Sequence, residues 1–265
     1  MDNLAQLKAA QKEGWKHFAP LETVTTPSAA RLVHFAGISP GARVLDVGCG
    51  TGVVAITAAR LRARVDAIDL TPQLLERARE NARIAKVDIE FLEADAEDLP
   101  FRDGEFDIVV SQFAHMFTPR PEVAIAQMLR VLRPGGTIAF STWPPELLVG
   151  RTMQLASRYM PPPPPGIPSP MLWGDPQIVT QRLGGAVADI VFDRDSILVP
   201  TLTPQHFRMV IERSAGPIVK MIETLAVSQP ERLESYRTEF DVIVSQYMRD
   251  NLICQGYLLT RARKV

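Results

Sequence analysis

The sequence predicts a doubly wound α/β fold with a mostly parallel sheet. From residue 43 onward, short apolar runs alternate with stretches in which apolar residues recur at helical spacing. This alternation is typical of strands and helices that succeed one another around a parallel sheet. In addition, the first apolar run leads directly into a turn with three glycines and then into a helical stretch. In such folds the crossovers are right-handed, and ligands bind beyond the carboxyl ends of the strands.

The N-terminal region is predicted to be helical. Apolar residues recur at helical spacing from Leu4 to Phe18, and Pro20 then ends the pattern. A second helical stretch runs from Pro27 to Phe35. We expect these helices to lead into the domain that follows.

The central region is predicted to contain five buried strands with helices between them. The expected strands cover residues 43–47, 64–69, 89–92, 106–110 and 136–140. The expected helices cover residues 53–61, 72–85 and 123–132.

Beyond Ser141 this alternation weakens. The chain passes through a proline-rich stretch that includes the consecutive prolines 161–165. We interpret these prolines as a stiff surface connector, with a polyproline ligand for a partner domain as the alternative. The remaining expected elements are a strand over 189–199, helices over 204–225 and 230–248, and a final strand over 256–260.

Composition and charge exclude several classes of protein. The 265 residues carry 29 basic and 30 acidic side chains, so no charge excess favours a nucleic acid or an acidic membrane as partner. No apolar run approaches the roughly 20 residues that cross a bilayer, and the N-terminus lacks a basic segment followed by a hydrophobic stretch. We therefore expect a cytoplasmic protein without a membrane span. Cys49 and Cys254 belong to no ligand cluster, so we expect no metal site.

The segment 44–52 is the most informative motif. A strand runs into Gly48, Gly50 and Gly52, and a helical stretch follows. Glycine adopts positive φ and lets a ligand approach the backbone, while the start of a helix offers free N–H groups. At the end of the next strand, Asp69 can accept hydrogen bonds from both hydroxyls of a ribose, with a helix cap as the alternative role. The pattern favours a nucleoside-containing ligand.

The glycine spacing separates the candidate ligands. A dinucleotide site requires the pattern GxGxxG, and Val53 stands where its last glycine would fall. A phosphate loop ends in Gly-Lys-Ser/Thr, whereas Gly52 is followed by two valines. Neither NAD nor ATP fits the turn well. An NAD(P)-dependent oxidoreductase, which shares the sheet and the ribose-binding acid, is the first alternative function.

The D-x-G-x-G-x-G pattern of residues 46–52, followed by Asp69, resembles the class I S-adenosylmethionine-dependent methyltransferases. Residues 92–101 (LEADAEDLPF) are similar to the motif after that family's third strand, and residues 130–136 (RVLRPGG) resemble the turn into its fifth strand. The resemblance covers about residues 40–142. Within this family, the sequence is most similar to the small-molecule methyltransferases of the ubiquinone/menaquinone-biosynthesis type.

This resemblance implies a fold and a cofactor. The implied fold is a Rossmann-like, mostly parallel sheet of seven strands with an N-terminal cover helix and a helical cap inserted near the C-terminus. We expect the cover in residues 1–40, the cofactor-binding core in 41–142, and completion of the same domain in 143–265, with cap helices at about 204–249. The implied cofactor is S-adenosylmethionine, with S-adenosylhomocysteine as product.

The resemblance also implies the cofactor contacts. In chain order, the expected contacts are Trp15, Asp46, Gly48, Cys49, Gly50, Asp69, Leu70, Asp95, Ala96 and Gln112. The glycine turn would touch the amino acid part, and Asp46 would orient this turn and help to hold the ammonium. Asp69 would bind the ribose and Leu70 the adenine face. Asp95 and Ala96 would meet the adenine edge, with a helix cap as the alternative for Asp95.

Methyl transfer from a sulfonium is an in-line displacement, so positioning is the main task of the enzyme. His115 is the one titratable group in the loop after the fourth expected strand, and an imidazole suits proton abstraction at neutral pH. A hydrogen-bonded wall residue is the alternative for His115. Gln112 would hydrogen-bond the cofactor or the acceptor, with packing as its alternative. Trp15 and Phe18 would close over the cofactor, with ordinary packing on the sheet as the alternative.

The acceptor class follows by elimination. The loop 111–119 lacks three features of other methyltransferase classes. These are the Asp/Asn-Pro-Pro-Tyr/Phe motif of enzymes that methylate amino groups of nucleic acids, the paired glutamates of protein-arginine enzymes, and the acidic cluster that binds magnesium in catechol-type enzymes. We therefore expect a small-molecule acceptor methylated on O, N or C, and a monomer or homodimer. The apolar residues of the late helices would form a lid, a core of their own or a dimer face. A non-catalytic S-adenosylmethionine-binding protein is the second alternative function.

Overall fold

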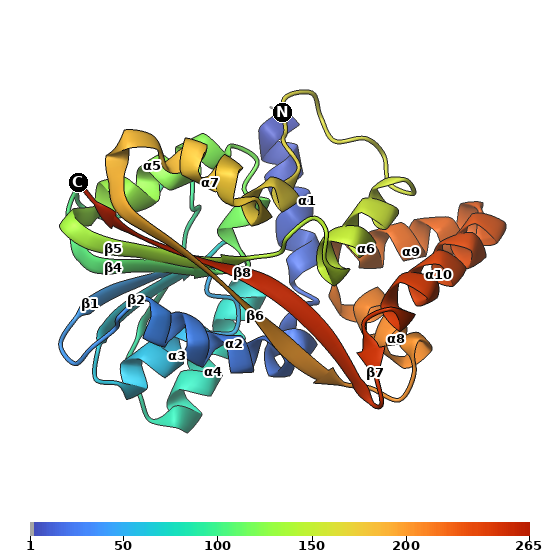
Figure 1. Ribbon diagram of the computed structural model, residues 1–265, viewed down its shortest axis with the longest axis horizontal. Helices are drawn as coiled ribbons and strands as arrows, with labels where there is room; N and C mark the ends of the chain where they lie inside the picture. The colour runs from blue at the N-terminus through green and yellow to red at the C-terminus, as the bar shows by residue number, and fades with distance from the viewer. Residues whose placement is uncertain (1–2) are drawn as a thin grey trace.

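One mixed β-sheet with helices on both faces organises the protein (Figure 1). The computed structural model describes residues 3–265, so the first two residues of the expected N-terminal cover lie outside the described part. The strands are β1 (Arg43–Val47), β2 (Arg64–Asp69), β3 (Glu90–Glu93), β4 (Phe106–Gln112), β5 (Leu132–Thr142), β6 (Val187–Pro200), β7 (Met248–Arg249) and β8 (Leu252–Lys264).

The sheet has the order β3-β2-β1-β4-β5-β8-β6, with the short β7 paired to β8 outside this path. Strands β1 to β5 pair in parallel, and β8 runs antiparallel between β5 and β6. The predicted doubly wound, mostly parallel sheet is therefore confirmed. The order reverses between β1 and β4, which is where such sheets bind their ligands.

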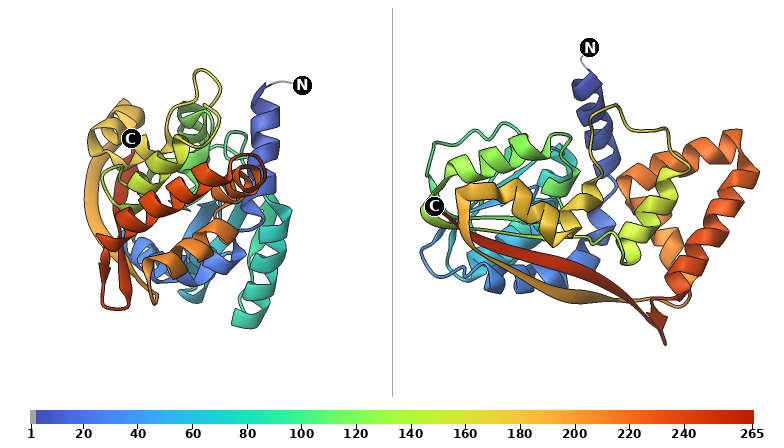
Figure 2. Two further views of the ribbon diagram at one scale, coloured as in Figure 1. Left: turned by 90° about the vertical axis from the view of Figure 1, so that its right-hand side faces the viewer. Right: turned by 45° about the horizontal axis from the view of Figure 1, so that its top comes forward.

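Helices cover both faces of this sheet and one end of the molecule (Figures 1 and 2). The α-helices are α1 (Asn3–Trp15), α2 (Glu22–Phe35), α3 (Val53–Arg60), α4 (Pro72–Ala85), α5 (Pro121–Val131), α6 (Leu148–Ser157), α7 (Pro176–Leu183), α8 (Pro204–Ser214), α9 (Gly216–Ser228) and α10 (Pro230–Ser245). Helices α2, α3 and α4 lie on one face, and α5 and α7 on the other. Because both faces are covered, central strand residues such as Val44, Val109 and Ile138 are fully buried.

The C-terminal strands extend well beyond the sheet. β6 and β8 form a long antiparallel ribbon, and the helical cap of α8, α9 and α10 is inserted between them (Figure 2). Helix α6 packs against α10. Both strands are longer than the sequence predicts, since their outer residues pair with each other after the parallel sheet has ended.

The helix predicted over 204–225 is wrong in one respect, because the chain forms two helices there. Ala215 is extended, with φ −86° and ψ 105°, and Pro217 lies in the first turn of α9. Proline lacks the N–H that would continue α8. A Cβ on Gly216 would lie 2.5 Å from the carbonyl carbon of Gly14, so this break also lets α9 approach α1 closely.

Four further elements differ from the sequence predictions. Helix α2 begins at Glu22 and contains Pro27 in its interior. Strand β4 continues to Gln112, so Ser111 and Gln112 belong to the strand and not to the following loop. Helices α6 and α7 were not expected, since prolines surround both. Within residues 3–265, no helix has the length and apolar character required to cross a membrane.

Candidate active site

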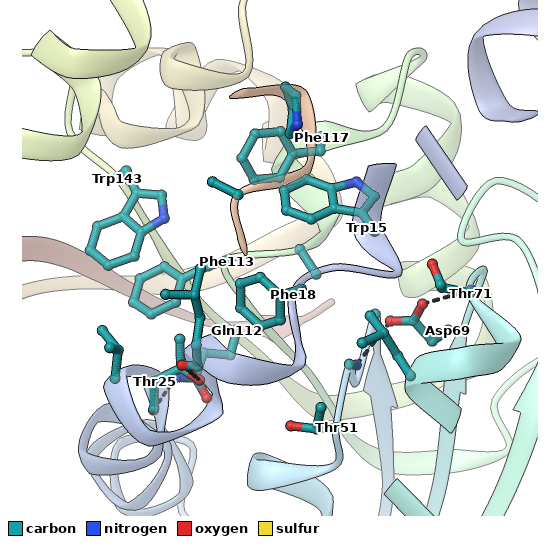
Figure 3. A pocket seen from close by; sticks show the side chains of 18 of the residues that line it. Trp15, Phe18, Thr25, Thr51, Asp69, Thr71, Gln112, Phe113, Phe117 and Trp143 are labelled. Atoms are coloured by element: carbon teal, nitrogen blue, oxygen red, sulfur yellow. Dashed lines mark hydrogen bonds between the residues drawn. The ribbon is translucent and has the colours of Figure 1, made fainter. Parts of the chain in front are cut away.

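A cavity of about 570 Å³ opens at the carboxyl ends of β1, β2 and β4 and continues beneath α1, α6 and the helical cap. The following residues, all singled out from the sequence, line it: Trp15, Asp46, Gly48, Cys49, Gly50, Asp69, Leu70, Asp95, Ala96, Gln112 and His115. Figure 3 shows Asp69 at one end and Trp143 at the other, with Phe18 between them. The fold thus brings segments from most of the chain to one site.

The glycine turn after β1 has the backbone conformation that its sequence predicts. Gly48, Gly50 and Gly52 have φ values of 71°, 55° and 84°. A Cβ on Gly48 would lie 2.4 Å from the Cβ of Ala114, so only glycine allows the β4 loop to approach this turn. A Cβ on Gly50 would meet nothing within 4 Å, because the turn faces the cavity there. This open face is where a ligand can contact the backbone.

Asp46 is a buried carboxylate at the end of β1. Its Oδ2 accepts the N–H of Ala55 at 3.0 Å, which ties the strand to α3. Its Oδ1 has no hydrogen-bond partner among the described residues. Burial, with a smaller contribution from the nearby charge of Asp69, raises the pKa of Asp46 to about 7. A cation placed against this carboxylate would therefore stabilise its ionised form.

Asp69 joins the end of β2 to the glycine turn. Its Oδ2 accepts the N–H of Gly50 at 2.9 Å, and its Oδ1 accepts the N–H of Thr71 at 2.8 Å (Figure 3). Burial raises the pKa of Asp69, and these two backbone hydrogen bonds oppose the rise. Each carboxylate oxygen has a further acceptor site beyond the one it uses. The neighbouring Cys49 is buried, which raises the pKa of its thiol well above the usual value and keeps it protonated.

Asp95 follows β3 and is held in an ion-pair network with α1. Its Oδ1 accepts the N–H of Glu97 at 2.9 Å, and its Oδ2 pairs with the ammonium of Lys8. Lys8 also contacts the buried Glu97 at 2.6 Å, and Glu97 pairs with Arg120 at 2.8 Å. The network fixes α1 across the end of the cavity that the Asp95 loop lines.

Aromatic rings extend the cover that α1 provides. The ring centroid of Trp15 lies 5.9 Å from that of Phe18 and 5.0 Å from that of Phe117. All three rings line the cavity (Figure 3). Trp15 therefore packs on other cavity residues instead of on the sheet.

Gln112 connects the end of β4 to α2. Its Nε2 donates to the carbonyl oxygen of Thr25 at 2.7 Å and to the hydroxyl of Ser28 at 2.6 Å. Since a carbonyl can only accept, these contacts fix the orientation of the amide. The donors of Gln112 are thus already used within the protein, while its Oε1 is buried without a partner among residues 3–265.

His115 is enclosed by aromatic residues. Its ring centroid lies 4.5 Å from that of Phe140 and 4.7 Å from that of Trp173, and the residue is 1% exposed. Neither ring nitrogen has a hydrogen-bond partner in the described structure. Burial, and to a smaller extent the charge of Arg182, lowers the pKa of His115 to about 3. A neutral ring with this pKa is a weak base at neutral pH, so its surroundings oppose the expected catalytic role.

The sequence predictions missed one wall of the cavity. Phe113 stacks on Trp143 with centroids 3.8 Å apart and ring planes at 9°. Phe113 has a φ of 55°, which is rare for a bulky residue and often occurs at binding sites. Met153 of α6 also lines this part, as does Ile211 of α8, which is one of the apolar residues of the late helices for which a lid was one expected role. Prolines 144 and 145 hid the helical pattern of α6, and only the fold brings Trp143 over Phe113.

Comparisons with known proteins agree with this architecture. Residues 45–140 match the family described as Methyltransferase domain. The uncharacterized protein Rv1403c of Mycobacterium tuberculosis is 36% identical over 244 residues, which cover 92% of this chain and 89% of the relative. A ubiquinone biosynthesis O-methyltransferase of Xanthomonas campestris is 35% identical over 142 residues, or 52% of this chain and 59% of the relative.

A solved structure shows the same fold. The YcgJ protein of Bacillus subtilis superposes with a TM-score of 0.60 at 19% identity, covering 90% of this chain and 98% of that one. The sheet order, the glycine turn after β1 and the match over residues 45–140 are consistent with one another. The chain therefore belongs to the class I S-adenosylmethionine-dependent methyltransferase family.

Proposed function

We propose that this methyltransferase transfers the methyl group of S-adenosylmethionine to an oxygen, nitrogen or carbon of a small organic acceptor. One observation carries the proposal: the glycine turn and its acids share a continuous cavity with an apolar compartment that the cap and α6 line. Such an arrangement lets two ligands meet within one enclosed space. When bound, S-adenosylmethionine supplies a methyl group already activated on a positively charged sulfur.

The residues of this chain fit that cofactor. The open face of Gly50 leaves room for a ligand against the backbone. The unpartnered Oδ1 of Asp46 is a suitable acceptor for the ammonium of the amino acid part. We assign Asp69 to the ribose hydroxyls and Leu70 to the adenine face. Asp95 and Ala96 would contact the adenine edge, since both line the same end of the cavity.

The protein's contribution to the reaction is positioning. Trp15 of α1, Phe18 and Phe117 cover one side of the cavity, and the Phe113–Trp143 stack forms a wall opposite the cofactor end. Holding a nucleophile about 3 Å from the methyl group in line with the breaking bond supplies several kcal/mol. Because His115 is enclosed and weakly basic, we assign it a structural role.

The proposal is tested by turnover. The purified protein is incubated with S-adenosylmethionine and a panel of phenols, quinols and amines, and formation of S-adenosylhomocysteine is followed by mass spectrometry. We expect acceptor-dependent product with at least one member of the panel, and the mass of the methylated acceptor then identifies the atom class. Tight cofactor binding with no turnover on any acceptor would favour the non-catalytic alternative.

A further inference from the structure

The side of the cavity that lies away from the glycine turn is lined mainly by apolar side chains, which determine the kind of ligand that it can bind. We call this side the acceptor compartment. Besides the Phe113–Trp143 stack, its wall is formed by apolar side chains from α6 and from all three cap helices. They are Leu148, Met153, Phe207, Ile211, Ile218 and Phe240.

No charged side chain of residues 3–265 lines the acceptor compartment. The charged side chains that line the cavity are Lys8, Asp46, Asp69 and Asp95, and all of them belong to the cofactor end. His115 also lines the cavity, but its ring is neutral at neutral pH because burial lowers its pKa. Lys8 is already paired with Asp95. The one ammonium of the described residues that lines the cavity is therefore already paired, and the carboxylates of Asp46 and Asp69 lie beside the glycine turn at the cofactor end.

No charged residue of the three cap helices lines the cavity, and four of these residues pair with one another. Arg208 contacts Asp241 at 2.9 Å and Glu212 at 3.0 Å, and Arg237 contacts Glu212 at 3.0 Å. None of these four residues lines the cavity. The cap thus has ion pairs on one side and an apolar surface on the side that faces the site.

The polar side chains within reach of the compartment are neutral. Thr152 and Thr201 line it, and their hydroxyls donate to the carbonyl oxygens of Val149 at 3.0 Å and Thr203 at 3.3 Å. Gln255 of β8 also lines it. These groups can bind a hydroxyl or a carbonyl of a ligand but cannot neutralise a charge.

Resting on the proposed function, we propose that the acceptor is an uncharged, mainly apolar molecule with a flat ring. A carboxylate or phosphate would lose its hydration in the compartment without gaining a counter-charge, and so would an ammonium. An apolar ligand instead gains the free energy of burial against these side chains. The parallel rings of Phe113 and Trp143 favour a flat ligand, since aromatic systems pack best in offset stacks or edge to face.

The proposal is tested with three probes that share one skeleton. Titration calorimetry at neutral pH measures the binding of 2-naphthol, 2-naphthoate and 2-naphthylmethylammonium to the complex with S-adenosylhomocysteine. We expect 2-naphthol to bind at least about tenfold more tightly than either ion. Equal or tighter binding of an ion, or no binding of the uncharged probe, would overturn the assignment.

A variant places a charge in the compartment and predicts the opposite preference. Met153→Lys puts an ammonium on the wall, and Met153→Leu is its uncharged control. We expect Met153→Lys to bind 2-naphthoate at least about tenfold more tightly than Met153→Leu does. Unchanged affinity for S-adenosylhomocysteine shows that both variants are folded. If Met153→Lys binds 2-naphthoate no more tightly than Met153→Leu does, the probes bind elsewhere and the proposal is overturned. Failure of S-adenosylhomocysteine to bind any form would instead contradict the proposed function.

Discussion

At the scale of single residues, two carboxylates beside the glycine turn differ in their surroundings and hence in their roles. Asp69 accepts two backbone hydrogen bonds, which favour its ionised form against burial. Asp46 accepts one, and its second oxygen has no partner in residues 3–265. We therefore expect Asp69 to shape the turn and bind neutral hydroxyls, and Asp46 to respond to a cation.

The substitution Asp69→Ala is expected to weaken S-adenosylmethionine binding by at least tenfold, or about 1.4 kcal/mol. It removes both the proposed ribose contacts and the support of Gly50. Calorimetric dissociation constants provide the measurement. Asp66→Ala is the control, because Asp66 lies on the same strand but outside the cavity. An unchanged constant for Asp69→Ala would remove Asp69 from the site.

We expect Asp46 to lower the free energy of unfolding as the pH rises from about 4 to about 7. The reason is that its pKa is raised in the folded protein, so the unfolded chain ionises first and binds fewer protons over this interval. Asp46→Asn removes this contribution. Urea unfolding without ligand should show that Asp46→Asn gains stability relative to the natural protein as pH increases across the interval. A difference that is independent of pH would show that Asp46 is ionised in the fold.

His115→Phe is expected to retain methyl transfer within about threefold, because phenylalanine fills the same aromatic enclosure and removes two unpartnered nitrogens. The natural protein should also lose stability as pH falls below about 6.5, where the unfolded imidazole takes up a proton that the folded ring does not. The variant should lack this loss. A hundredfold lower kcat at unchanged cofactor affinity would identify His115 as the base after all.

At the scale of elements, α1 links the cofactor end of the cavity to the cap. Lys8 of α1 pairs with Asp95, and Gly14 of the same helix contacts Gly216 of α9. Lys8 and Gly14 lie about 1.7 turns apart on the same helix. The position of α1 therefore depends on both ends of the site at once.

Gly216→Ala is expected to destabilise the protein by about 1–3 kcal/mol. The new Cβ would lie 2.5 Å from the carbonyl carbon of Gly14, which is too close for the two helices to keep their present distance. Urea unfolding measures the change. Gly185→Ala is the matched control, because a Cβ on Gly185 would meet nothing within 4 Å. Equal effects of the two substitutions would contradict a tight contact between α1 and α9.

The sequence predicts the elements of the cofactor half better than those of the acceptor half. Alternating apolar runs and the glycine turn lie close together in the chain, so local pattern was sufficient to predict β1, α3 and the acid at the end of β2. The break at Ala215 and the extra helix α6 depend on prolines, whose effect varies with tertiary context. The surroundings of His115 could not be predicted, because Trp173 is distant in the chain and the fold alone brings it there.

At the scale of the whole molecule, the parallel sheet and the C-terminal β6–β8 ribbon position opposite ends of the site. The parallel strands carry the turn and the acids of the cofactor end, while the β6–β8 ribbon holds the cap over the opposite end (Figure 1). The family match covers residues 45–140, which excludes the cap. Acceptor choice therefore depends on the part of the chain in which family resemblance is least informative.

The central claim, that this cavity binds S-adenosylmethionine at its glycine end, is tested most directly by calorimetric titration with S-adenosylmethionine, S-adenosylhomocysteine and NADH in parallel. We predict binding of the first two with dissociation constants on the order of micromolar and no binding of NADH. Binding of NADH alone would contradict the account and require the glycine turn to be reinterpreted as a dinucleotide site.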